Sequence, residues 1–211
     1  MESRVPVELL PHGRAREVMM LNRENEKTLG QLLEGNRRFF EEKQIHPHGS
    51  SARRREVAGG QHPTTVVVSC SDSRVPPEIL FDQGLGDLFV VRTAGNVIDD
   101  TALGSIEYAV VHLGVRLVVV LGHTGCGAVG AALAGGETEG HLGSVMEALA
   151  TAVDEVRHLE GDTFDLASRR NVELTVAALK SSEPILSPLA GELDIVGCYY
   201  DLDSGRVRVI C

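Results

Sequence analysis

Tryptophan is absent from this chain of 211 residues, and aromatic residues make up only 4% of it. Cysteine is scarce as well, with four residues, and a chain of this length buries roughly 70% of its unfolded surface without needing disulfide bonds. The longest aliphatic run, residues 117–121, is far shorter than the ~20 residues of a membrane-spanning helix. These absences argue against a disulfide-stapled scaffold and against a membrane-spanning protein. They leave a globular chain whose length fits one domain.

Basic residues are outnumbered, with 20 Lys and Arg against 30 Asp and Glu, which gives a formal net charge of −10. An acidic surface repels nucleic acid and anionic membranes, so we expect neither as a partner. The first 21 residues mix charged and apolar side chains without the sustained apolar core of a secretory signal. We therefore expect a cytoplasmic protein, in which thiols stay reduced and are available to bind a metal.

Two short polar stretches organise the chain, and each follows an aliphatic run. They read Cys70-Ser71-Asp72-Ser73-Arg74, after residues 64–68, and His123-Thr124-Gly125-Cys126-Gly127, after residues 117–121. Such runs are typical of buried parallel strands, and open α/β sheets bind ligands at the carboxyl ends of their strands. Cys70, His123 and Cys126 would converge there as a ligand set that suits zinc. Three protein ligands leave one position for water or substrate, which indicates a catalytic zinc site.

The motifs C-x-D-x-R and H-x-x-C, in this order and each after a predicted strand, resemble those of the β-class carbonic anhydrases. The segments 86–96 and 105–110 are also similar to segments of that family, and the resemblance extends over residues 28–210. It implies an enzyme that binds Zn²⁺ through Cys70, His123 and Cys126. The reaction it implies is the reversible hydration of a small molecule, carbon dioxide, to bicarbonate and a proton by metal-bound hydroxide.

Asp72 and Arg74 stand two residues apart, so both side chains can share one side of an extended loop. The planar guanidinium of arginine can bind a carboxylate through two parallel hydrogen bonds. The resemblance implies a catalytic pair, in which Arg74 holds Asp72 away from the zinc and Asp72 accepts a hydrogen bond from the metal-bound water. If the pair breaks, Asp72 could become the fourth ligand and stop the reaction. The sequence leaves open whether an inactive state uses this ligation.

A substrate pocket follows from the same resemblance. Gln61 matches an amide that hydrogen-bonds a substrate oxygen, and Phe89, Ala94 and Tyr108 match an apolar wall that a second subunit supplies in part. An apolar cleft suits carbon dioxide, which has no charge and forms hydrogen bonds poorly. Gly127 follows the last predicted ligand at a helix start, where its backbone N–H can stabilise developing negative charge. We expect these five residues to bind the substrate.

The hydrophobic pattern predicts a single α/β domain over residues 26–211, with a mainly parallel central sheet and helices on both faces. The expected helices are 26–43, 76–81, 102–113, 128 onward, 142–159 and 166–181, and the expected strands are 64–68, 88–91 and 117–121. Segments 193–200 and 207–210 are expected to form a C-terminal strand hairpin around the turn at 203–205.

The first 25 residues are expected to form a polar N-terminal arm, with at most a short helix of its own. Pro6, Pro11 and Gly13 interrupt any regular pattern in it. The arm leads into the first long helix, so that the chain begins as a helical arm, and Thr28 is the expected N-cap because Gln31 follows it three residues later.

Several other polar or reactive side chains are given no function. His46 and His48 lie among Pro and Gly in a predicted surface loop, and the run Arg53-Arg54-Arg55 is expected to be a solvated helix face. Cys198 stands in an apolar strand pattern and is expected in the core. His112 is expected at a helix end or on the surface, and no histidine is assigned as a proton shuttle.

Two rival functions remain beside carbon dioxide hydration. A carbonyl sulfide or carbon disulfide hydrolase would use the same zinc site, and relatives with that activity share these motifs. A non-enzymatic, zinc-stabilised interaction module would keep only the ligands. Asp72, Arg74 and Gln61 argue against such a module, because a structural zinc site needs none of them. The sequence leaves the physiological substrate and the metabolic pathway open.

The resemblance also bears on regulation and assembly. Some members of the family carry a tryptophan three residues before the first zinc cysteine, which is associated with an inhibitory bicarbonate site. Val67 stands there in this chain, so the always-open subtype is the better match. The N-terminal helix of such proteins packs on a neighbouring subunit, so we expect a homo-oligomer, either a dimer or a larger assembly.

Overall fold

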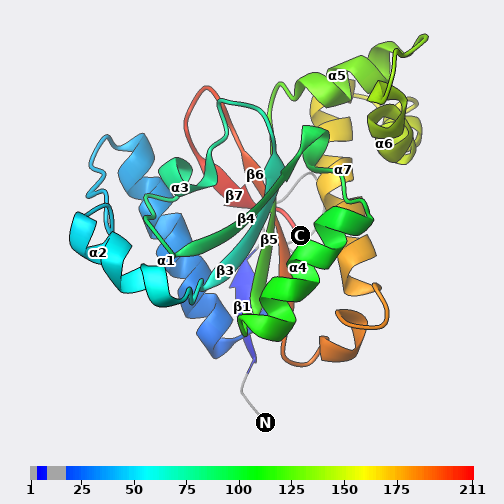
Figure 1. The fold of residues 1–211 in the computed structure, drawn as a ribbon. Helices are drawn as coiled ribbons and strands as arrows, with labels where there is room; N and C mark the ends of the chain where they lie inside the picture. The colour runs from blue at the N-terminus through cyan, green and yellow to red at the C-terminus, as the bar shows by residue number, and fades with distance from the viewer. Residues whose placement is uncertain (1–3, 9–17) are drawn as a thin grey trace.

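The computed structural model describes residues 4–8 and 18–211, and its centre is a five-stranded sheet with the strand order β4-β3-β5-β6-β7 (Figure 1). The strands are β3 (Thr65–Cys70), β4 (Leu88–Thr93), β5 (Leu117–His123), β6 (Asp194–Tyr200) and β7 (Val207–Val209). The first four of these run parallel, and β7 pairs antiparallel with β6. The predicted α/β class, the mainly parallel sheet and the C-terminal hairpin are therefore confirmed.

Helices cover both faces of the sheet, as the aliphatic runs predict for strands buried on two sides. The helices are α1 (Arg23–Phe40), α2 (Ser51–Glu56), α3 (Pro77–Leu80), α4 (Asp100–His112), α5 (Gly127–Ala134), α6 (Leu142–Val156) and α7 (Thr163–Lys180), with short 3₁₀ turns at Val57–Gly59, Ala94–Asn96 and Ser187–Leu189. Alternate residues of β3 point to opposite cores: Val66 and Val68 pack with α4 and α7, and Val67 packs with α1 and α3. None of the described helices combines the length and apolar character needed to cross a membrane.

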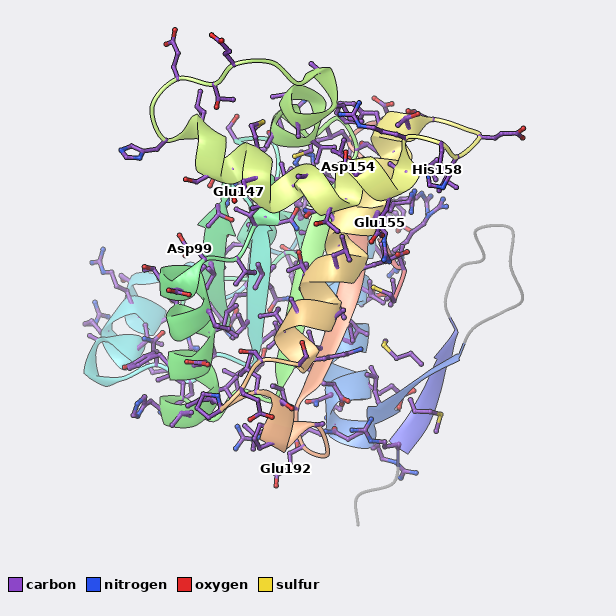
Figure 2. All side chains as sticks on the ribbon, turned by 90° about the vertical axis from the view of Figure 1, so that its right-hand side faces the viewer. Asp99, Glu147, Asp154, Glu155, His158 and Glu192 are labelled. Carbon is purple, nitrogen blue, oxygen red and sulfur yellow. The ribbon has the colours of Figure 1, made fainter. Side chains whose placement is uncertain are left out.

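The parallel register brings the two predicted metal loops together. Ser69, next to the end of β3, pairs with Leu121 of β5, so the two strands end at the same edge of the sheet. Above this edge, α5 and α6 form a third apolar cluster with Cys70 and Cys126, through residues such as Leu149. Figure 2 shows α6 lying across the upper end of the sheet and of α7.

The N-terminal segment differs from the expected arm. Residues Arg4–Glu8 and Val18–Asn22 form an antiparallel pair, β1 and β2, in which Pro6 lies opposite Met20. Proline is tolerated in such a two-stranded ribbon because both strands are edges. The prediction that the N-terminal arm lacks regular structure is therefore wrong for residues 4–8 and 18–22. Pro11 and Gly13 lie outside the residues that the structure describes.

The first long helix begins earlier than expected. Its N-cap is Asn22, whose side chain accepts a hydrogen bond from the backbone N–H of Asn25 at 2.9 Å. Thr28 lies inside the helix and donates to the carbonyl of Glu24, so its assignment as the cap is wrong. The buried carboxylate of Asp194 explains the difference, because it accepts from the Asn22 N–H and the Asn25 side chain and so fixes the helix start from β6.

Most of the residues given no function lie where the sequence places them. His46 and His48 are in the loop before α2, and Arg54 and Arg55 are exposed on α2. The predicted solvated face is wrong for Arg53, whose side chain is only 21% exposed because it donates to the carbonyl of Leu85 at 3.0 Å. Cys198 is fully buried in the core between the sheet and α1. All four cysteines have free thiols.

Candidate metal centre

The three predicted ligands meet at the carboxyl edge of the sheet. Cys70 is the last residue of β3, His123 is the last residue of β5, and Cys126 is the N-cap of α5. Their ligand atoms all lie within 4.8 Å of one another, and all three residues are buried. Parallel pairing of β3 and β5 produces this convergence from residues more than 50 positions apart.

The histidine presents a free lone pair to the two thiols. His123 Nδ1 lies 2.8 Å from the carbonyl oxygen of Thr124, which can only accept, so Nδ1 carries the proton. His123 Nε2 is then an unprotonated acceptor, and it is buried without a hydrogen-bond partner. A buried, unpartnered imidazole nitrogen beside two thiols fits a metal ligand whose ring is oriented by a carbonyl on its other side. The Cys₂His set suits Zn²⁺.

The two thiols are in contact, and each affects the ionisation of the other. Cys70 Sγ lies 3.9 Å from Cys126 Sγ, and this contact lowers the pKa of Cys70 and raises the pKa of Cys126. The pair as a whole therefore gives up one proton readily and holds the second, and Cys70 is the sulfur that is better placed to be the thiolate. Backbone N–H groups of Asp72 and Gly95, at 3.4 and 3.3 Å, donate to that thiolate. A cation would take the place of the remaining proton, since cysteine binds metals as the thiolate.

Asp72 and Arg74 form the predicted pair beside the metal loops. Arg74 Nε donates to Asp72 Oδ1 at 3.0 Å and Nη2 donates to Oδ2 at 2.7 Å, and Nη2 also donates to the carbonyl of Gly125 at 3.1 Å. Arg74 thus connects the first metal loop to the second. Its guanidinium lowers the pKa of Asp72 to about 2, so that this carboxylate is ionised and can only accept hydrogen bonds near neutral pH.

Two further residues support the backbone around the predicted ligands, and they were not identified from the sequence. Arg92 on β4 donates to the carbonyl oxygens of Cys70 and Asp72 at 2.9 and 2.6 Å. Asn171 on α7 donates to the carbonyl of Gly95 at 2.8 Å. Arg92 lies in a segment that resembles the family, and Asn171 is a polar residue on a buried helix face. These two features of the sequence could have drawn attention to Arg92 and Asn171. Neither feature shows that the hydrogen-bond partner is a backbone carbonyl.

The predicted substrate-binding residues divide between the two ends of the sheet. Ala94 follows the end of β4 and Gly127 begins α5, so both lie near the metal ligands. Phe89 and Tyr108 contact each other, with ring centroids 6.3 Å apart. Phe89 pairs with Val66, four residues before the end of β3, which is about 13 Å along the strand from the metal loop.

Gln61 belongs to the same distant group. It is exposed and precedes the first residue of β3, and the strand carries the chain away from it toward the metal loop. A single chain therefore does not bring Gln61, Phe89 and Tyr108 to its own metal ligands. These three residues can therefore contribute to a metal centre only in a second copy of the chain.

The fold and this centre define a metal-dependent α/β enzyme with a buried Cys₂His ligand set. The family model described as carbonic anhydrase matches residues 65–207. The chain is 49% identical to carbonic anhydrase 2 of Mycobacterium tuberculosis over 181 residues, which cover 83% of this chain and 87% of that protein. It is 44% identical to a carbonic anhydrase of Mycolicibacterium smegmatis over 184 residues, or 84% of this chain and 89% of the relative.

Solved structures agree with these matches. The β-carbonic anhydrase of Coccomyxa in complex with acetazolamide superimposes with a TM-score of 0.70 at 32% identity, over 86% of this chain and 85% of that one. A tetrameric β-carbonic anhydrase of Sordaria macrospora gives 0.67 at 28% identity, over 87% and 96%. The chain belongs to the β-class carbonic anhydrases. These are zinc enzymes, so the expected cofactor is confirmed for the family.

Proposed function

We propose that this protein catalyses the reversible hydration of carbon dioxide to bicarbonate and a proton, with Zn²⁺ held by Cys70, His123 and Cys126. The observation that carries the proposal is the convergence of two thiols and an unpartnered imidazole nitrogen within 4.8 Å. When bound, zinc lowers the pKa of a water molecule at its open position and so makes a nucleophile available near neutral pH.

Asp72 orients the attacking water. The carboxylate of Asp72 is ionised near neutral pH, so Asp72 offers only acceptor oxygens and receives a hydrogen bond from that water. This hydrogen bond uses a proton of the water and leaves a lone pair free to face carbon dioxide. The rate of attack depends on the position of the water, because a misplaced nucleophile reacts much more slowly.

Arg74 keeps Asp72 available for this role. Its two parallel hydrogen bonds hold both carboxylate oxygens in place and leave acceptor capacity for the water, and its third bond, to Gly125, anchors the guanidinium on the second metal loop. A freed Asp72 could reach the open metal position as a fourth ligand and exclude water. The backbone N–H of Gly127, at the start of α5, can stabilise negative charge on the product.

The substrate pocket is proposed to be completed by a second copy of the chain. Gln61, Phe89 and Tyr108 lie at the opposite end of the sheet from the ligands of their own chain, and β4 is a half-exposed edge strand. Tyr108 and Val111 on α4 are 48% and 52% exposed, which places apolar surface beside this edge. The description of the Sordaria macrospora relative as tetrameric supports an assembly of at least two chains.

The reducing cytoplasm remains the proposed location, because two free thiols 3.9 Å apart must stay reduced to bind zinc. Fractionation of cells and a thiol count on the isolated protein test this proposal. A disulfide between Cys70 and Cys126 in the freshly isolated protein would contradict it.

The function is tested by stopped-flow carbon dioxide hydration on protein of known zinc content, with carbonyl sulfide as a parallel substrate. We expect one zinc per chain and rapid hydration, and we expect Cys126→Ala to lose both. Carbonyl sulfide turnover without carbon dioxide turnover would favour the rival hydrolase. Full zinc occupancy in Cys126→Ala would contradict the ligand assignment.

A further inference from the structure

Asn171 is a buried amide that the proposed reaction does not use. It lies on α7 with 4% of its surface exposed, and its Nδ2 donates to the carbonyl oxygen of Gly95 at 2.8 Å. The backbone N–H of Gly95 in turn donates to Cys70 Sγ at 3.3 Å. A side chain on α7 is thereby connected to the predicted ligand thiolate through one residue, Gly95. Figure 2 shows α7 running alongside the sheet toward the end that α6 covers.

Gly95 needs such an anchor because of its conformation. Its φ is +67°, in the left-handed region, and a Cβ there would lie 3.2 Å from both Ala128 and Leu149. Glycine rotates more freely than any other residue, and Gly95 lies in a short turn that is not part of a regular helix or strand. Its N–H and its carbonyl lie on opposite sides of the same Cα. Fixing the carbonyl with Asn171 therefore restricts the direction in which the N–H points.

The direction of that N–H matters for the metal. A hydrogen bond to an ionised acceptor is stronger than one between neutral groups, and it stabilises the thiolate, which is the form of cysteine that binds a metal. Groups that hydrogen-bond to ligands set ligand orientation and commonly change metal affinity by roughly 10- to 100-fold. Among the described residues, only Asp72 and Gly95 donate a backbone N–H to Cys70 Sγ.

We propose that Asn171 is a positioning residue, which holds the Gly95 N–H on the Cys70 thiolate and thereby slows metal release from the centre. The proposal rests on the proposed zinc site. It assigns to α7, a helix that supplies no ligand, a direct part in retaining the metal.

The test compares Asn171→Leu with Thr175→Val in the zinc-loaded protein. Leucine has a similar size to asparagine and cannot donate a hydrogen bond. Thr175 is the matched control, since it is buried one turn further along α7 and donates only to the helix carbonyl of Asn171. Zinc release to a chelator is measured well below the unfolding temperature of each variant. In cadmium-113-loaded protein, the scalar coupling between cadmium and the Gly95 amide proton reports the N–H···S bond directly.

We expect Asn171→Leu to release zinc at least about 10-fold faster and to lose the cadmium coupling at Gly95, while Thr175→Val keeps both values of the unmodified protein. Equal release rates and an unchanged coupling in Asn171→Leu would overturn the proposal. Equally fast release from Thr175→Val would also overturn it, because the effect would then come from loosening α7 in general.

A second variant covers the case in which Asn171→Leu does not fold. Asn171→Ser keeps a polar group too short to reach Gly95, and the same faster release and lost coupling are expected. If the unmodified protein bound neither zinc nor cadmium, the proposed metal site itself would fail. If it bound both and the serine variant matched it, only the role of Asn171 would fail.

Discussion

At the scale of single residues, the site depends on pairs in which one member controls the form of the other. Thr124 fixes the tautomer of His123 through its carbonyl, and Arg74 lowers the pKa of Asp72 to about 2. The Thr124 carbonyl also fixes the orientation of the His123 ring, and the Arg74 guanidinium fixes the orientation of the Asp72 carboxylate. Changing a member of such a pair should therefore alter the chemistry more than the stability.

Asp72→Asn tests the role of the carboxylate. The amide has nearly the same shape but can donate as well as accept, so it no longer enforces one orientation of the attacking water. We expect this variant to keep zinc and to lose carbon dioxide hydration by about 100-fold or more, as stopped-flow kinetics on zinc-quantified protein would show. Unchanged turnover would remove Asp72 from the mechanism. Asp203→Asn, at an exposed position, is the control and should keep full activity.

Arg74→Ala tests the other member through pH. The folded-state pKa of Asp72 is about 2, below its ordinary value of 3.8, so the ionised pair contributes stability above pH 3.8 and loses it as the pH falls toward 2. In metal-free protein, urea unfolding should show the unmodified chain more stable than Arg74→Ala at pH 5, with the difference vanishing near pH 2. A difference that does not depend on pH would contradict the pairing.

In the zinc-loaded form, Arg74→Ala has a second expected outcome. Without its partner, Asp72 is free to bind the open metal position, and X-ray absorption at the zinc edge should show a carboxylate ligand in place of water. An unchanged set of zinc neighbours would mean that something other than Arg74 keeps Asp72 away from the metal.

At the scale of elements, the ends of strands and helices carry the function. β3 and β5 supply their last residues as predicted ligands, and α5 supplies its N-cap. The start of α1 has a comparable structural anchor, because Asp194 of β6 accepts from Asn22 and Asn25 and lies 3.5 Å from Arg4. One buried carboxylate therefore joins the sheet, α1 and the N-terminal ribbon.

Asp194→Ala should reduce stability rather than chemistry. The change leaves the Asn22 N–H and the Asn25 side-chain donor without their buried acceptor, and a lost partner of this kind costs about 1–3 kcal/mol. Urea unfolding of Asp194→Ala should show that loss, and Asp203→Ala should lie within about 0.5 kcal/mol of the unmodified protein because it is exposed. A neutral effect at Asp194 would mean that Asn22 caps α1 without help from the sheet.

At the scale of the whole molecule, the two ends of the sheet carry complementary parts of one proposed site. The metal ligands and Asp72 lie at the carboxyl end, and Phe89 lies near the amino end with Tyr108 against it. These parts can form one site only if two chains associate so that the amino end of the sheet in one chain meets the carboxyl end of the sheet in the other. An isologous dimer would complete two sites at once.

Mixing two inactive variants tests this arrangement. Cys126→Ala lacks a metal ligand and Gln61→Ala lacks the distant amide, so a mixed dimer would contain one intact site. Because half of the dimers are mixed after exchange of chains and each has one of two sites restored, activity should recover to roughly a quarter of the unmodified level. Recovery is followed by stopped-flow kinetics together with mass photometry.

The control mixes Cys126→Ala with Asp72→Asn, whose defects lie in the same half of the site, and no recovery is expected. Absence of recovery in the first mixture, with chain exchange demonstrated by mass, would refute the shared pocket. The zinc site of each chain would be unaffected by that result.

The sequence by itself determined the three predicted metal ligands and the Asp72–Arg74 pair beside them. Cys70, His123 and Cys126 are identifiable because each follows an aliphatic strand run, and parallel strands bring their carboxyl ends to one edge. Asp72 and Arg74 are identifiable because they are two residues apart on one loop. The order of the main helices and the C-terminal hairpin followed from local patterns of the same kind, and the matching elements are present in the structure.

Only the tertiary structure decided the contacts between residues far apart in the sequence. Thr28 has the local signature of a helix cap, but Asn22 is the cap because Asp194, 172 residues away, holds it. Arg92 and Asn171 act on backbone carbonyls, which every residue possesses, so no side-chain pattern can reveal their partners. The separation of Phe89 from the metal loop is likewise set by strand register, because a pairing of β3 with β4 fixes positions along the strands that composition and spacing leave free.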